Sequence, residues 1–130
     1  MKTFLGKIEA KVDAKGRVFV PSVFRKVFSE EDRERIVVRM EADEKYLLVY
    51  PESVWNKQVL DLQSKLNEWD PEDQMLLMQF VGDAEMLDFD AQGRVLLSKR
   101  LQGRLGGDSE LVFVGMVDRI ALWSKSMYEE

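Results

Sequence analysis

The stretch Val12-Asp13-Ala14-Lys15-Gly16-Arg17-Val18-Phe19-Val20-Pro21 recurs as Phe89-Asp90-Ala91-Gln92-Gly93-Arg94-Val95-Leu96-Leu97-Ser98. The copies are 77 residues apart, and Asp, Ala, Gly, Arg and Val coincide without a gap. A second correspondence follows at an offset of 73, where Leu47–Tyr50 and Trp55 match Ile120–Trp123 and Tyr128. Because an internal repeat determines the architecture, we predict two similar units. The first should carry about four additional residues, around Glu41–Lys45.

Each copy is predicted to form a β-hairpin followed by a short helix. Apolar and polar residues alternate from Lys7 to Asp13, the period of a half-buried strand. Asp-Ala-Lys-Gly suits a type I turn followed by a glycine in the left-handed conformation. After each hairpin, apolar residues recur three or four positions apart, as in a helix. The residues expected to shape the two turns are Asp13, Gly16, Asp90, Gly93 and Arg94.

The remaining elements are two strand pairs and a pair of helices. Strands are expected at 36–40, 47–50, 111–114 and 120–123, and Ser124 should cap a last helical turn. Pro51 opens a helix whose apolar stripe is Trp55, Val59, Leu62, Leu66 and Trp69. Asp70 and Pro71 start a second helix that ends at Gly82. That helix is apolar almost all round, so it should be deeply buried or lie at a subunit interface.

These elements predict one fused α+β domain that is mainly β with added helices. A unit of about 50 residues is marginal alone, so the two repeats should share one core. The expected division is a first repeat at 1–55, a bridging helical pair at 52–81 and a second repeat at 82–130. Trp55, Trp69 and Trp123 are expected in the core, because they lie on apolar stripes or at strand ends.

The composition excludes several classes of function. The chain has no cysteine and no histidine, which removes disulfides, thiolate metal sites and the commonest general base. No apolar run is long enough to span a membrane, and the start lacks a signal-peptide core. We therefore expect a cytoplasmic protein with no cofactor, no membrane partner and no small-molecule substrate.

The charge is distributed unevenly. The net charge of −5 argues against a nucleic-acid partner, but residues 1–65 have a balance of +2 and residues 66–130 of −7. Seven bases lie within residues 2–26: Lys2, Lys7, Lys11, Lys15, Arg17, Arg25 and Lys26. The residue 77 positions further on is not basic for five of these bases: Lys7, Lys11, Lys15, Arg25 and Lys26. Only Arg17 corresponds to a base in the second copy, Arg94. A structural turn does not need these extra charges, so we predict a functional basic face.

Such a face can bind DNA. A two-stranded ribbon fits the major groove, where arginine can bond guanine O6 and N7, while lysines can anchor on phosphates. The candidate DNA-binding residues are Lys15, Arg17, Lys11 and Lys7.

These motifs, together with Leu47-Leu48-Val49-Tyr50-Pro51 and Val114-Gly115 followed by Asp118-Arg119-Ile120 and Trp123, resemble the MraZ family over nearly the whole chain. The family consists of bacterial transcriptional regulators of the division and cell-wall gene cluster, and contains two SpoVT/AbrB-like units. The resemblance implies a pseudo-twofold, swapped-hairpin β-barrel built from the two repeats, with added helices. It also implies a ring-shaped homo-oligomer, association with the nucleoid, and binding to short G-containing repeats in double-stranded DNA upstream of the operon.

The same resemblance maps the DNA-contacting hairpin of the family onto Lys15 and Arg17, with Asp13 and Gly16 shaping it. The second unit departs from the first by carrying Ser98 in place of Pro21. In a ring, several weak contacts to spaced repeats gain avidity, which would compensate for the acidity of the chain.

Two other interpretations remain open. The Asp–Arg pairs of the turns could serve as acid and base in an enzyme, although the chain lacks His, Cys and a phosphate-binding glycine loop. Alternatively, the chain is a protein-interaction module of the same barrel class, antitoxin-like or a scaffold, with the acidic second half as its contact surface. The feature that separates DNA binding from this last interpretation is whether the face formed by Lys7, Lys11, Lys15 and Arg17 is exposed and uncompensated.

Overall fold

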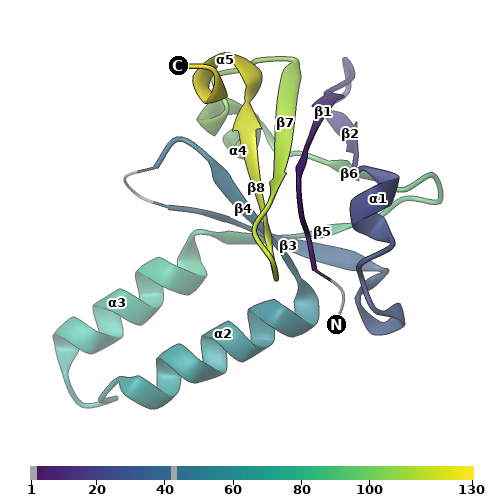
Figure 1. Cartoon of the computed structure of the whole chain (residues 1–130). Helices are drawn as coiled ribbons and strands as arrows, with labels where there is room; N and C mark the ends of the chain where they lie inside the picture. Colours follow the sequence, from purple (N-terminus) through teal and green to yellow (C-terminus); the bar gives the residue numbers. More distant parts are fainter. Residues whose placement is uncertain (1–2, 42–43) are drawn as a thin grey trace.

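The computed structural model describes residues 3–41 and 44–130, and it has a mixed α+β fold with antiparallel sheets and two repeats (Figure 1). Each repeat runs strand, turn, strand, helix, strand, strand, helix, in the predicted order. The additional residues of the first copy are predicted around 41–45, and residues 42–43 of that segment lie outside the described residues. The elements are β1 (Lys7–Lys11), β2 (Arg17–Phe19), α1 (Ser22–Arg25), the 3₁₀ turn η1 (Glu30–Asp32), β3 (Arg35–Met40), β4 (Leu47–Pro51), α2 (Glu52–Lys65), α3 (Pro71–Gly82), β5 (Ala84–Asp88), β6 (Arg94–Leu96), α4 (Lys99–Arg104), β7 (Glu110–Gly115), β8 (Ile120–Ser124) and α5 (Lys125–Tyr128).

The strands form a six-stranded sheet in the order β1-β7-β8-β4-β3-β5 and a separate two-stranded ribbon of β2 and β6. This pairing corrects the predicted hairpins. β1 and β2 meet only at a single bridge, between Val12 and Val18, before they separate. β1 then pairs with β7 of the second repeat, and β5 pairs with β3 of the first. Local residues specify the turn, but the strands on either side of each turn find their main partners in the other repeat.

This exchange lets the two repeats bury one common core. The main cluster contains Val18 and Val95 of the ribbon, Phe24 of α1, Leu101 of α4 and Phe113 of the sheet, all almost fully buried. Such residues are shielded from water only when the ribbon and both short helices cover the same face of the sheet. The ribbon is therefore fixed on the core by one face, which leaves the other face outside.

The helical pair extends from the opposite side of the sheet (Figure 1). Its root is buried, because Trp55 of α2 stacks on Phe80 of α3 with ring centroids 5.1 Å apart and also packs 5.4 Å from Tyr50. The prediction that Trp55 is a core residue is confirmed. Trp123 is half-buried and lies 4.8 Å from the Tyr46 ring. In the described part of the chain, no helix has the length and apolar character needed to cross a membrane.

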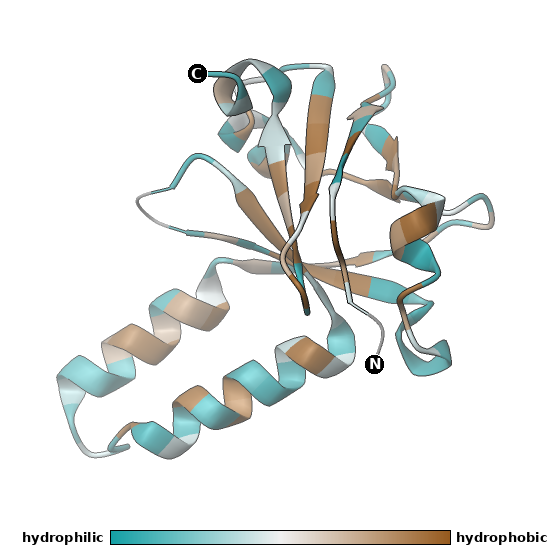
Figure 2. Ribbon diagram, in the orientation of Figure 1, coloured by the Kyte–Doolittle hydropathy of each residue, from teal (hydrophilic) through white to brown (hydrophobic). Residues whose placement is uncertain are grey.

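The outer part of the pair differs from the prediction. Trp69 is 84% exposed, so its assignment to the core is wrong. The physical reason is that α2 ends at Lys65, and Trp69 lies in the following loop, where the helical period no longer holds. α3 begins as predicted, with the Asp70 carboxylate accepting a hydrogen bond from the Glu72 N–H, but none of its residues is buried. Deep burial of α3 is therefore excluded, and Figure 2 shows apolar bands along its surface.

Helix ends in the two repeats are stabilised in different ways. Pro21 makes no side-chain cap for α1, whereas the Ser98 hydroxyl accepts a hydrogen bond from Leu101 N–H at the start of α4. Ser98 thus holds the junction that Pro21 stiffens in the first repeat. Ser124 caps α5 as predicted, by accepting from Met127 N–H.

Asp32 is a buried carboxylate within the charged segment 29–34, where no sequence pattern distinguishes it from its acidic neighbours. It accepts hydrogen bonds from the Ser53 N–H at 2.8 Å, the Ser53 hydroxyl and the Ser29 hydroxyl at 3.0 Å. We expect Asp32→Ala to lower the free energy of unfolding by about 1–3 kcal/mol, because these donors are left without an acceptor. Urea denaturation checks this, with exposed Glu31→Ala as the control, and equal midpoints for the two variants would contradict it.

Candidate nucleic-acid interface

The first turn is built around the Asp13 carboxylate. Its Oδ1 accepts hydrogen bonds from the backbone N–H groups of Lys15 and Arg17, both at 2.9 Å, and its Oδ2 accepts from Arg17 Nε at 2.7 Å. Gly16 donates its N–H to the Asp13 carbonyl and has a φ of +89°, the left-handed conformation that the turn requires. The turn therefore fixes both the backbone and the guanidinium of Arg17.

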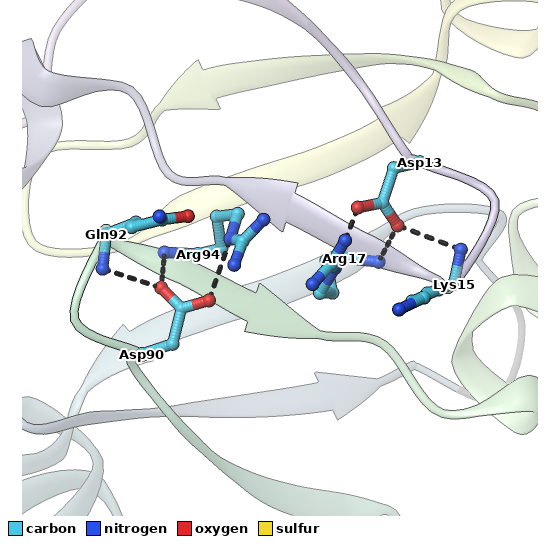
Figure 3. Close-up of polar contacts among 6 residues, drawn as sticks. All are labelled: Asp13, Lys15, Arg17, Asp90, Gln92 and Arg94. Carbon is cyan, nitrogen blue, oxygen red and sulfur yellow. Dashed lines mark hydrogen bonds and ion pairs between the residues drawn. The ribbon is translucent and has the colours of Figure 1, made fainter.

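The second turn repeats this geometry. Asp90 accepts from the N–H groups of Gln92 and Arg94 at 2.9 Å and from Arg94 Nε at 2.7 Å, and Gly93 has a φ of +83°. Figure 3 shows the two turns at opposite ends of the paired strands, with both Asp–Arg pairs formed. The same hydrogen-bond pattern therefore holds both turns.

The ribbon formed by β2 and β6 presents one continuous outer face. In its register Arg17 lies opposite Leu96 and Phe19 lies opposite Arg94, so all four side chains share a face, while Val18 and Val95 point inward. Phe19 and Leu96 are 53% and 56% exposed. The Arg17 and Arg94 side chains are 33% and 20% exposed, and the Arg94 guanidinium carbon lies 5.7 Å from the centre of the Phe19 ring. The candidate residues predicted from the sequence do not include Phe19 and Leu96, although their positions beside the arginines at a period of two could have indicated this face.

The lysines of the predicted basic face do not share the outer face of the ribbon. Ile8 and Ala10 of β1 pack against the core that the ribbon covers, so the alternate residues Lys7 and Lys11 point to the other side of the sheet. Lys7 and Lys11 are exposed on β1, and Lys15 is exposed at the tip of the first turn. None of the three forms an ion pair within residues 3–41 and 44–130, although Lys7 Nζ lies 5.5 Å from the Tyr128 ring centre. Glu9 lies between Lys7 and Lys11 on β1, but its charge is engaged by Lys125 at 2.8 Å. The face is therefore exposed and partly compensated.

The turn carboxylates are held in the ionised form. The pKa of Asp13 is lowered first by the hydrogen bond from the Arg17 N–H, and then by the Arg17 guanidinium and the Lys15 N–H. The pKa of Asp90 is lowered in the same way by the Arg94 N–H, the Arg94 guanidinium and the Gln92 N–H. A general acid needs a pKa raised towards neutral pH. The geometry thus gives these carboxylates a structural role. In the described part of the chain, no group of three or more acidic side chains is arranged to hold a metal ion.

These lowered pKa values predict acid sensitivity. Folding favours ionised Asp13 and Asp90, so the stability they contribute is complete above the ordinary Asp pKa of 3.8 and disappears as the pH falls below it. The variant Asp13→Asn/Asp90→Asn should be less stable than the parent at pH 7 and show a smaller fall in melting temperature between about pH 5 and pH 3. Glu9, Asp108 and Asp118 also have lowered pKa values and leave a residual dependence. Parallel melting curves across this range would contradict the assignment.

The fold and the site define a class: a two-repeat protein that holds a paired β-ribbon on its core through two Asp–Arg turns. Comparison with known proteins identifies the family within that class. The family model described as "MraZ protein, putative antitoxin-like" matches residues 3–79 and again 80–130. The chain belongs to the MraZ family of transcriptional regulators.

Individual relatives agree over nearly the full length. The chain is 38% identical over 130 residues to the transcriptional regulator MraZ of Bacteroides fragilis, covering all of this chain and 82% of the relative. It is 42% identical over 127 residues to the transcriptional regulator MraZ of Phocaeicola vulgatus, and the match covers 98% of this chain and 82% of the relative. It is 38% identical over 129 residues to that of Neisseria meningitidis, where the match covers 97% of this chain and 83% of the relative. These relatives are regulators of transcription rather than enzymes, so the enzymatic interpretation is excluded.

Proposed function

We propose that this protein is a sequence-specific DNA-binding regulator of the division and cell-wall gene cluster and acts on short repeats upstream of it. The outer face of the β2–β6 ribbon enters the major groove, where Arg17 bonds a guanine edge. Lys7, Lys11 and Lys15 bind flanking phosphates and carry no sequence information. The observation that supports this most is the ribbon itself, which carries Arg17 and Arg94 on its outer face and is anchored by Val18 and Val95 on the other.

We further propose that the protein acts as a ring-shaped homo-oligomer at the nucleoid. The helical pair is the proposed subunit contact, because its outer apolar residues are exposed in the single subunit: Leu60, Trp69, Met75, Leu76, Met78 and Val81. In this proposal residues 1–55 and 82–130 are the two AbrB-like repeats, which close into a swapped-hairpin barrel, and residues 52–81 are the bridge.

The test is fluorescence anisotropy with duplex DNA from upstream of the gene and with a scrambled duplex, each at two salt concentrations. Specific binding should favour the upstream duplex, and affinity for both should fall as salt rises, because bound phosphates release counterions. Equal and negligible binding to both duplexes would overturn the proposal. It would favour the second candidate, an antitoxin-like protein-interaction module, which the family description and the acidic second half support.

A further inference from the structure

A cleft of about 480 Å³ lies between α1 and the second turn. Three basic side chains line it: Arg25, Lys26 and Arg33. Its other lining residues are Ser22, Phe28, Phe89 and, from the second turn, Asp90, Ala91 and Gly93. The bases come from the first repeat and the turn from the second, so this cleft exists only because the repeats exchange strands.

The charge of the cleft is not neutralised by its own residues. Among the described residues that line it, Asp90 alone is acidic, and its carboxylate is already engaged by Arg94 and by two backbone N–H groups. Within residues 3–41 and 44–130, none of Arg25, Lys26 and Arg33 forms an ion pair. The cleft therefore presents positive charge to solvent.

The other repeat provides an internal comparison for Arg25. Arg25 Nε donates to the Val20 carbonyl at 2.9 Å, and its guanidinium packs so closely on Gly93 that a Cβ there would collide with it. At the equivalent place Gln102 Nε2 donates to the Leu97 carbonyl at 2.8 Å and packs on Gly16, where a Cβ would lie 2.6 Å away. A neutral amide thus performs the structural task that Arg25 performs, so the fold does not require the positive charge of Arg25.

The topology explains the position of these charges. β2 and β6 are antiparallel, so α1, which follows β2, lies beside the turn that precedes β6, as Figure 1 shows. Bases that are close in the sequence are therefore divided between the two ends of the ribbon. Lys15 lies at one end, beside the first turn, and Lys26 and Arg33 lie at the other, beside the second.

We propose that this cleft is a phosphate-binding site, formed by Arg25, Lys26 and Arg33, that holds a backbone phosphate when the ribbon is on DNA. The DNA part rests on the proposed function. A paired guanidinium and ammonium are suited to phosphate oxygens. The volume exceeds what one phosphate needs, so the adjoining sugar can pack against Phe89, which is half-buried. The cleft then holds the second end of the ribbon on the DNA, where the turn itself has Gln92 in place of a lysine.

The first test compares two charge-matched double variants, Lys26→Gln/Arg33→Gln in the cleft and Lys57→Gln/Lys65→Gln on α2. The cleft variant should bind the upstream and scrambled duplexes about tenfold more weakly, and its slope of log affinity against log salt should be shallower by about 0.9 for each phosphate that it no longer neutralises. The α2 variant should keep the parental affinity and slope, with light scattering confirming an unchanged assembly.

Arg25→Gln should also weaken binding while keeping the parental melting temperature, because a glutamine at the equivalent position, Gln102, donates to the equivalent carbonyl in the second repeat. Parental affinity and slope in the cleft variants would overturn the role on DNA.

The second test uses inorganic phosphate without DNA and follows the amide signals of Ala91 and Gly93 by NMR. Phosphate should shift these signals in the parent and not in Arg25→Gln. If phosphate shifts them while the cleft variants bind DNA normally, the site takes a free phosphate-bearing compound and the DNA assignment is overturned. If phosphate shifts nothing, the anion site itself is overturned. Failure of the parent to prefer the upstream duplex would instead overturn the proposed function. The phosphate titration would still show whether the cleft binds an anion.

Discussion

Replacing Arg17 with alanine is expected to abolish the preference for the upstream duplex over a scrambled one. A bidentate arginine–guanine contact contributes about 1–3 kcal/mol of discrimination, and the effect recurs in each subunit that engages a repeat. Arg17 is suited to this contact because the Asp13 carboxylate holds its Nε at 2.7 Å and pre-orients the side chain on the exposed ribbon face. The remaining guanidinium nitrogens make no hydrogen bond within the described part of the chain. Anisotropy titrations of both duplexes measure the effect.

The chain provides a matched control for this variant. Arg94→Ala removes an identical 2.7 Å pair with Asp90, so it should perturb its turn to the same extent. Arg94 is less exposed than Arg17 and packs near Phe19, and no lysine stands at position 92. We therefore expect a smaller decrease in specificity from Arg94→Ala, with similar melting temperatures for both variants. Equal decreases in binding together with equal falls in melting temperature would assign Arg17 a structural role only.

The local features of the fold could be predicted from the sequence because they depend on neighbouring residues. The Asp13 and Asp90 turns, with their glycines at positive φ, follow from steric limits on four or five adjacent residues. The same is true of the Asp70 and Ser124 caps, since a capping side chain reaches only two or three residues along the chain. For features of this kind, the residues that determine the geometry are all present in one short stretch of sequence.

Partners that are distant in the sequence could not be obtained in this way. The alternation of β1 fits a hairpin with β2 as well as it fits the observed pairing with β7, because alternation identifies a buried face and not the neighbouring strand. Arg25 shows the consequence for the site. Its sequence position groups it with the bases of the first hairpin, but the exchange places it against Gly93 of the second turn. The basic surface is therefore divided in a way that only the topology reveals.

The assembly should depend on the apolar surface of the helical pair. Met75 and Met78 lie three residues apart on α3, and both are exposed in the single chain. Met75→Glu/Met78→Glu places two charges there, which is incompatible with burial at a subunit contact. We expect light scattering to show dissociation of the homo-oligomer at micromolar concentration, while the melting transition remains cooperative, because neither side chain contributes to the core.

Dissociation of the ring should also weaken binding to a duplex that carries several repeats. Linked binding sites gain about 10²- to 10⁴-fold in avidity, so the variant should bind a multi-repeat duplex more weakly while keeping the parental affinity for a single repeat. The control, Leu5→Glu/Met86→Glu, adds the same charge at exposed apolar positions outside the helical pair and should keep the assembly. A parent protein that is already monomeric would contradict the ring, and an assembled Met75→Glu/Met78→Glu variant would contradict the helical contact. Avidity through the ring also explains how a chain with a net charge of −5 can bind DNA with a small contact in each subunit.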